Sequence, residues 1–126
     1  METRQEIVKK CLPSGVNGVC LKPLTLYLKL LSRKWMIFII MVLPSDSTPL
    51  RYSEIKNRVK GITSEKISDT TLSLRLNELV TNLIVKRQQF NEIPPRVEYC
   101  LNEKGIQLQD NLQPLIEWAI TDCHNG

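Results

Sequence analysis

The sequence has few of the residues from which catalytic and metal sites are built. Its one histidine, His124, stands near the C-terminal end, and its four cysteines form no CxxC pair. This pattern argues against a zinc site and is typical of a reducing, cytoplasmic compartment. The five glycines form no glycine-rich phosphate loop, and no nucleophile stands in an arrangement with a base. We therefore predict no enzyme, no cofactor and no metal.

The sequence also lacks a long hydrophobic run. The stretch 35–43 is strongly apolar but only nine residues long, whereas a membrane-spanning helix needs about 20. Residues 1–10 are mostly polar or charged, so they contain no apolar core of a secretory signal. We expect a buried helix over 33–43 and no contact with a membrane.

Charge is distributed unevenly along the 126 residues. Residues 1–99 hold 16 Lys and Arg against 9 Asp and Glu, while residues 100–126 hold one Lys against four acidic residues. A basic body with an acidic end suggests that one surface meets a polyanion. A chance distribution of surface charge explains the counts equally well, so charge alone leaves both interpretations open.

The stretch 67–99 carries the clearest structural signal. Leu72, Leu76, Leu79 and Leu83 recur at the spacing of one helical face, and Ser68 or Asp69 can cap the start of this helix. Two β-prone runs follow, 84–90 and 96–101, joined by a turn that contains two prolines. A polar-faced helix followed by a hairpin predicts a winged helix, which is an α+β fold that is mainly α.

The rest of the chain supplies supporting elements. We expect helices over 22–31 and over 33–43, the latter stopped by Pro44, and then a brief strand at 50–51 beside the hairpin. Ser53 caps a predicted helix through Val59, which is the first helix of the helix-turn-helix, and 61–66 is a linker. Asn102 caps a final helix, which Pro114 should kink or restart.

The organisation that follows is a single winged-helix domain over 1–126. An N-terminal arm covers 1–21 and includes a short amphipathic helix that ends by Pro13. The winged-helix core covers 22–101, and a C-terminal dimerisation helix covers 102–126. The last helix is more apolar than a helix on a small domain requires, which favours a second subunit as its partner.

Several short motifs together are similar to those of one family. The motifs are Lys34-Trp35, Arg51-Tyr52-Ser53-Glu54-Ile55, Ile67-Ser68 with Leu72, Arg75-Leu76-Asn77-Glu78-Leu79, Pro94-Pro95-Arg96-Val97-Glu98-Tyr99, then Leu101, Glu103, Gly105 and Trp118. Over about residues 20–119 the chain resembles the HxlR-type transcriptional regulators, which are related to the MarR-like winged-helix proteins. The resemblance implies a homodimer on pseudo-palindromic operator DNA. The chain departs from the family pattern by an insertion of about five residues at 61–66 and by the spacing of Cys20 from Pro23 and Trp35.

For DNA contact we single out residues on the two motif helices and the hairpin: Lys56, Thr70, Thr71, Ser73, Leu74, Arg75, Lys86, Arg87 and Arg96. Arg75 is suited to guanine, although a phosphate contact or a bracing role inside the fold is an equal alternative. Arg96 is the candidate cation of the wing, with an ion pair to Glu92 or Glu98 as its alternative. Lys86 and Arg87 alternate along a strand, so only one of them can face DNA.

Three further expectations concern partners and regulation. The predicted dimerisation residues are Leu24, Leu28, Leu112, Leu115, Ile116 and Trp118. The resemblance implies a thiol sensor near the N-terminus, for which Cys20 is the candidate and Cys11 a second, against the alternative of a buried structural cysteine. The competing function is a winged helix that binds protein rather than DNA, and no residue identifies a small-molecule effector.

Overall fold

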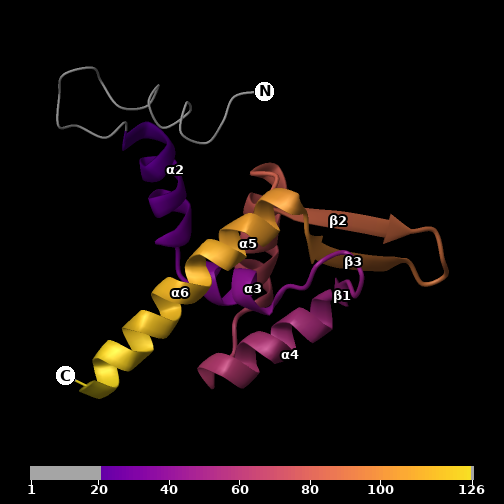
Figure 1. Ribbon diagram of the computed structural model, residues 1–126. Helices are drawn as coiled ribbons and strands as arrows, with labels where there is room; N and C mark the ends of the chain where they lie inside the picture. Colours follow the sequence, from indigo (N-terminus) through magenta and orange to yellow (C-terminus); the bar gives the residue numbers. More distant parts are fainter. Residues whose placement is uncertain (1–20, 126) are drawn as a thin grey trace. The chain divides into compact units, whose positions relative to one another are not determined.

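The computed structural model describes residues 21–125 (Figure 1). It divides into two compact units, Met1–Lys34 and Trp35–Gly126, which we describe separately. In the first unit, helix α2 covers Leu21–Leu31, in agreement with the helix predicted over 22–31. Three of its leucines, Leu24, Leu26 and Leu28, are exposed. The arm predicted over 1–21 falls outside the described residues except for its last position.

The second unit contains the remaining elements in a mainly helical order. They are α3 (Met36–Val42), β1 (Leu50–Arg51), α4 (Tyr52–Thr63), α5 (Asp69–Thr81), β2 (Val85–Phe90), β3 (Arg96–Leu101) and α6 (Glu103–Asn125). The strands form one antiparallel sheet in the order β1-β3-β2, with Leu50 opposite Tyr99 and Val85 opposite Leu101. The winged helix-turn-helix fold and the brief strand β1 are as predicted.

The core lies where the helices of this unit meet the root of the sheet. Its fully buried side chains come from α3, α4, α5 and the strand ends: Met36, Ile39, Ile40, Leu43, Ile55, Val59, Ile67, Leu72, Leu76, Leu79, Ile84 and Leu101. The hairpin of β2 and β3 projects away from this core, and α6 starts at its root (Figure 1). The Gln109 side chain of α6 donates to the carbonyl oxygens of Ile40 and Leu43, at 2.9 and 3.0 Å. It thereby satisfies groups that the end of α3 leaves free.

Helix α3 is shorter than the predicted helix over 33–43. It begins at Met36, because Trp35 adopts a left-handed conformation with φ 77° and so interrupts right-handed helical geometry. The carbonyl oxygen of Trp35 accepts the first helical bond, from the amide of Ile39 at 3.0 Å. Periodicity alone did not reveal this break, because a left-handed residue leaves no signal in the spacing of apolar side chains.

Helix α4 is longer than the predicted helix over 53–59. Its start is capped by the Glu54 carboxylate, which accepts from the amide of Arg51 at 3.0 Å, so the prediction that Ser53 caps it was wrong. At its other end the helix continues through Gly61 to Thr63 and stops at Ser64, whose φ is 59°. Half of the predicted linker over 61–66 is therefore helical. Helix α4 thus covers the first half of 61–66, the stretch in which an insertion of about five residues is predicted.

Helix α5 matches its prediction except at its end. Ser68 is the residue that caps it, since its hydroxyl oxygen accepts from the Thr71 amide at 3.2 Å. Leu72, Leu76 and Leu79 are buried as predicted, but Leu83 lies beyond the helix and is 66% exposed. Leu83 has φ 59°, and the amide of Ile84 bonds back to the Leu79 carbonyl at 3.0 Å. This left-handed cap ends the helix at Thr81, two residues before the last leucine of the series.

Helix α6 begins as predicted, with the Asn102 side-chain oxygen accepting from the Gly105 amide at 3.0 Å. Pro114, which was predicted to kink or restart the helix, lies inside one continuous helix, so the helix does not restart there. Gly105 lies against the backbone of Ile84, the residue just before β2. A Cβ atom at this position would stand 2.1 Å from the Ile84 carbonyl oxygen. Only glycine allows this close approach.

We predict that Gly105→Ala lowers the free energy of unfolding by about 1–3 kcal/mol, since the added methyl must displace backbone rather than a flexible side chain. Gly61→Ala is the matched control, because its Cβ would meet nothing within 4 Å inside α4. There the substitution should raise stability by about 0.5–1 kcal/mol. Urea unfolding of both variants measures the difference, and equal stability of the two would contradict the proposed clash.

Candidate nucleic-acid interface

The outward face of α5 is the centre of the candidate interface. Burial of the three leucines leaves Thr70, Ser73, Leu74 and Asn77 exposed on the opposite side of the helix. We call these four residues the exposed face of α5. Asn77 was not among the predicted contacts, although its position three and four residues beyond Leu74 and Ser73 could have identified it. The face carries hydroxyl, amide and apolar groups and no charge.

Thr71, a predicted DNA contact, is engaged at the start of the helix. Its side-chain oxygen accepts from the Ser68 hydroxyl at 2.8 Å, while its amide donates to the same Ser68 oxygen. Thr71 is half-buried. The structure therefore places Thr71 within the cap of α5 rather than on the exposed face.

Arg75 lies outside the exposed face as well. Its guanidinium bonds to the Glu78 carboxylate at 2.7 Å, and the two side chains are only 14% and 19% exposed. A charged pair with so little exposure braces one turn of the helix and has limited freedom to leave it. This geometry fits the bracing role within the fold, which the sequence leaves open as an alternative to base contact by Arg75.

Lys56 makes an ion pair within the protein. Its ammonium lies 2.6 Å from the carboxylate of Asp69, the first residue of α5. The Tyr52 hydroxyl donates to the carbonyl oxygen and the carboxylate of the same Asp69, both at 3.0 Å. Tyr52 and Lys56 come from α4, so this cluster joins the two helices of the helix-turn-helix at the start of α5.

Electrostatics in this cluster follow from its geometry. The hydrogen bond from Lys56, and then that from Tyr52, lower the pKa of Asp69 below the ordinary value of 3.8. Burial is the main cause of the raised pKa of Tyr52. Both groups therefore keep their usual charge states near neutral pH, with Asp69 ionised and neutralised by Lys56.

The wing consists of β2, β3 and the loop 91–95 between them. Lys86 and Arg87 are both exposed, but they pair across the sheet with Cys100 and Tyr99, so their side chains lie on opposite faces. Arg96 lies at the base of the loop and is 29% exposed. Its guanidinium nitrogens are 3.3 Å from both Glu92 and Glu98.

The Phe90 ring completes the environment of Arg96. The guanidinium carbon lies 4.2 Å from the ring centroid, and the two residues are partners across the hairpin. The ion pairs of Arg96 with Glu92 and Glu98, which were the predicted alternative to DNA contact, are thus present. The contact with the Phe90 ring adds to them. DNA contact by Arg96 stays a prediction.

The predicted dimerisation residues lie on two helices, α2 and α6. On α2, Leu24 and Leu28 are both exposed. On α6, Leu115 and Trp118 are exposed, at 55% and 64%, and Ile116 is half-buried. Leu112 is only 6% exposed. Because its own chain covers it, Leu112 offers a partner little surface. Ile120, 55% exposed, was missed by the sequence reasoning and extends the apolar surface of α6.

The described cysteines differ from the predicted sensor residues. Cys100 is buried, which raises the pKa of its thiol, and Cys123 is exposed; both are free. Cys11 and Cys20 fall outside the described residues, so the sensor prediction stays a prediction. Within residues 21–125, no group of three metal-ligating side chains could hold an ion, and no helix is long and apolar enough to cross a membrane.

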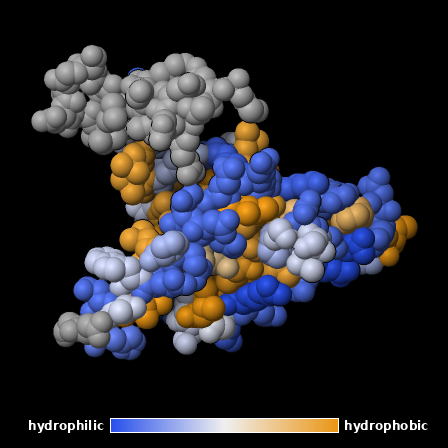
Figure 2. Space-filling view, in the orientation of Figure 1, coloured by the Kyte–Doolittle hydropathy of each residue, from blue (hydrophilic) through white to orange (hydrophobic). Residues whose placement is uncertain are grey.

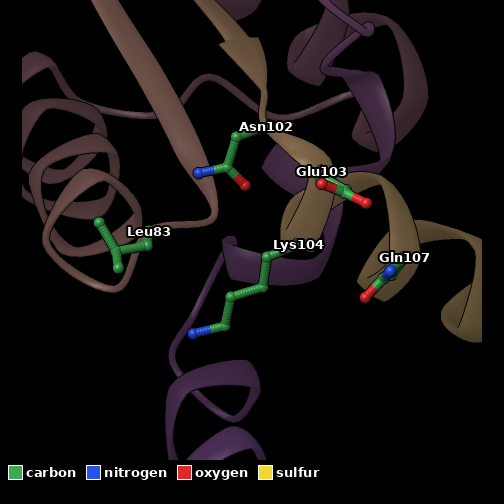
Figure 3. A pocket seen from close by; sticks show the side chains of 5 residues that line it. All are labelled: Leu83, Asn102, Glu103, Lys104 and Gln107. Atoms are coloured by element: carbon green, nitrogen blue, oxygen red, sulfur yellow. The ribbon is translucent and has the colours of Figure 1, made fainter. Parts of the chain in front are cut away.

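An open depression of about 480 Å³ lies beside the start of α6. It is lined by Leu83, which follows α5, and by Asn102, Glu103, Lys104 and Gln107 (Figure 3). The Lys104 ammonium donates to the Asn82 carbonyl oxygen at 3.0 Å. The lining combines charged, amide and apolar groups without a pattern that identifies a ligand.

With the fold and its exposed face established, comparison with known proteins assigns the family. The family model described as HxlR-like helix-turn-helix matches residues 30–125. The chain belongs to this family. Relatives of similar sequence and of similar structure are both named as transcriptional regulators. The chain is accordingly a transcriptional regulator.

Individual members of the HxlR-like family support the assignment over most of the chain. YodB of Bacillus subtilis is 38% identical over 110 residues, which are 87% of this chain and 91% of YodB. The structure of its reduced form gives a TM-score of 0.67 at 36% identity, covering 83% of this chain and 96% of that one. An uncharacterized regulator of Halalkalibacterium halodurans is 37% identical over 78% of this chain and 81% of its own length.

A more distant structure shows the wider relationship. A putative MarR-family transcriptional regulator of Porphyromonas gingivalis has a TM-score of 0.67 at 26% identity, covering 79% of this chain and 90% of that one. The winged helix predicted from the hairpin and its preceding helix, and the MarR-like relationship that the resemblance implied, are thereby confirmed.

We predict that Asp69→Asn makes stability less sensitive to acid. The folded-state pKa of Asp69 is lowered, so its contribution to stability is present above 3.8 and is lost as pH falls through the lower folded value. Between about pH 5 and pH 3 the parent should therefore lose more stability than the variant. Urea unfolding across this range measures the effect, with Asp110→Asn on α6 as control. Identical acid dependence of the parent and Asp69→Asn would contradict the role assigned to the cluster.

Proposed function

We propose that this HxlR-like regulator binds double-stranded DNA sequence-specifically as a homodimer on a pseudo-palindromic operator. Helix α5 enters the major groove, and the wing follows the backbone or the minor groove. The observation that carries the proposal is the exposed face of α5. It presents uncharged hydrogen-bonding and apolar groups, because the charged residues of the helix are paired elsewhere: Asp69 with Lys56, and Arg75 with Glu78.

Such a face suits base reading. Thr70 and Ser73 can donate to or accept from base edges, Asn77 can bond adenine in two places, and Leu74 can contact a thymine methyl group. Pairing of Asp69 with Lys56 also removes an unfavourable negative charge from the part of α5 that would approach phosphates. In this proposal Thr71 and Arg75 support the helix rather than read bases.

Phosphate contacts in the proposal come from the margins of the interface. Arg58 and Lys60 are exposed on α4, and Lys66 is exposed in the link to α5. Lys86 or Arg87 adds a cation on one side of the wing. Contacts of this kind provide affinity that depends on salt but not on sequence.

The competing function is a winged helix whose same surfaces bind a protein. The two functions differ in their response to DNA. Fluorescence anisotropy on a duplex from the chain's own promoter and on a random duplex, at two salt concentrations, should show salt-sensitive binding with preference for the promoter. Absence of binding to either duplex at low salt would favour protein binding instead.

We predict that Thr70→Glu abolishes this preference while leaving the fold intact. Position 70 is the second residue of α5, where a negative side chain is compatible with the helix dipole, so stability should change by less than about 0.5 kcal/mol. In the groove the same charge faces phosphates, and affinity should fall by about tenfold or more. Gln107→Glu adds an equal charge to α6 and serves as control. Equal DNA affinity of both variants would place α5 outside the groove.

The homodimer in the proposal rests on the apolar surface of α6. Leu115, Trp118 and Ile120 are all more than half exposed on one helix, a pattern typical of an interface. A symmetric pair of such helices would present two recognition helices to two half-sites, which is why a palindromic operator is expected.

Trp118→Glu should therefore convert the protein from a dimer to a monomer at micromolar concentration. Because Trp118 is 64% exposed within its own chain, the substitution should leave the unfolding of the single chain nearly unchanged, whereas a desolvated interface cannot accept the charge. Light scattering measures the mass, with Ile62→Glu at the exposed end of α4 as control. A parent that is already a single chain would refute the dimer.

Regulation by a thiol is a further part of the proposal. One of the related structures is of diamide-treated YodB, and another is of its reduced form. These relatives support a thiol response in this chain, with Cys20 as its candidate. If DNA binding by a Cys20→Ser variant responds to diamide as the parent does, Cys20 is not the sensor.

A further inference from the structure

The tip of the wing is apolar and fully exposed. Ile93 has a relative exposure of 103%, the highest among the exposed large hydrophobic residues of the described chain. It is flanked by the exposed residues Asn91 and Glu92 on one side and by Pro94 and Pro95 on the other. An orange, hydrophobic patch lies at the far end of the mostly blue hairpin in Figure 2. Nothing within the fold accounts for an isoleucine at this position.

Arg96 is set back from this tip and is held in place. Its guanidinium lies over Phe90 at 4.2 Å and near Glu92 and Glu98, both at 3.3 Å. These contacts neutralise the acidic residue of the loop and link the two strands at its base. The point of the wing is thereby an uncharged hydrocarbon group, followed by two prolines that limit its conformational freedom.

We propose that Ile93 enters the minor groove of DNA beside the site of α5 and packs against A·T base pairs. This inference rests on the proposed function. The minor-groove floor of a G·C pair carries the 2-amino group of guanine, whereas that of an A·T pair carries only acceptors. An apolar side chain can approach the A·T floor more closely and does not bury an unpaired amino donor there.

The surroundings of the tip favour DNA over a protein partner. The exposed cations Lys86 and Arg87 stand on the strand that leads to the loop, so the hairpin is attracted toward a phosphate backbone. At the loop itself, Arg96 offsets the charge of Glu92. Arg96 also faces Glu98, but the hairpin over 85–101 has three cations against two acidic residues. Its net charge therefore still attracts a polyanion.

The experiment compares the parent with Ile93→Ala on the promoter site, located by footprinting. Pairs that the wing covers are changed from A·T to G·C and then to inosine·C, which lacks the 2-amino group. For the parent, G·C should weaken binding about fivefold and inosine·C should restore it. Ile93→Ala should bind the A·T site about fivefold more weakly and should no longer distinguish the three duplexes. Ile62→Ala, at an exposed isoleucine of α4, should behave like the parent.

A second variant tests the competing role of Arg96. The double substitution Arg96→Gln with Glu92→Gln keeps the net charge of the loop, and under the proposal it should leave the salt dependence of binding unchanged. If this variant flattens the salt slope by about one while Ile93→Ala binds as the parent does, the wing holds a phosphate through Arg96 and the inference is overturned. Equal sensitivity of Ile93→Ala and the parent to the 2-amino group also overturns it. If the parent binds no duplex at all, both the inference and the proposed function fail.

Discussion

Burial of Leu72, Leu76 and Leu79 is the constraint on which the rest of the winged helix depends. Each of these side chains is at most 1% exposed, and removing one of them would leave a cavity that costs about 2–5 kcal/mol. Their common direction determines how α5 is rotated about its axis. Consequently the opposite side of the helix, from Thr70 to Asn77, is directed to solvent and is available to a partner.

Around this helix the charged residues act mainly on one another. Asp69 joins α5 to α4 through Lys56 and Tyr52, and Arg75 bonds within its own helix to Glu78. The interface that remains has neutral groups at its centre and cations at its margins. In the proposed function this division would separate sequence reading from phosphate attraction, because hydrogen-bonding groups discriminate bases whereas Lys and Arg at the margin provide affinity without discrimination.

Helix α6 connects the wing to the surface proposed for dimerisation. Its first turn approaches the backbone at Ile84 through Gly105, and its middle part bonds to the end of α3 through Gln109. Its second half carries Leu115, Trp118 and Ile120 in exposed positions. A rigid attachment at one end and an apolar surface at the other would make the distance between two recognition helices depend on how two copies of α6 pack.

The sequence by itself determined the type and order of the elements. Leucine spacing, Ser68, Asn102 and the two prolines of the hairpin are local signals, because helix periodicity, capping and turn formation involve residues a few positions apart. The same locality explains the errors at helix ends. The left-handed residue Trp35 delays the start of α3, and Ser64 and Leu83 end α4 and α5, at positions where propensity requires no boundary.

Only the tertiary structure decided which candidate residues are free to bind. Lys56, Arg75 and Arg96 are suitable DNA contacts by residue type, yet each has an acidic partner in the fold. The partner of Lys56 is 13 residues away in the chain. Ile93 shows the converse, since an isoleucine is expected in a core but here is fully exposed. Pairing and exposure depend on which surfaces meet when the chain folds, and that information is not local to any stretch of the sequence.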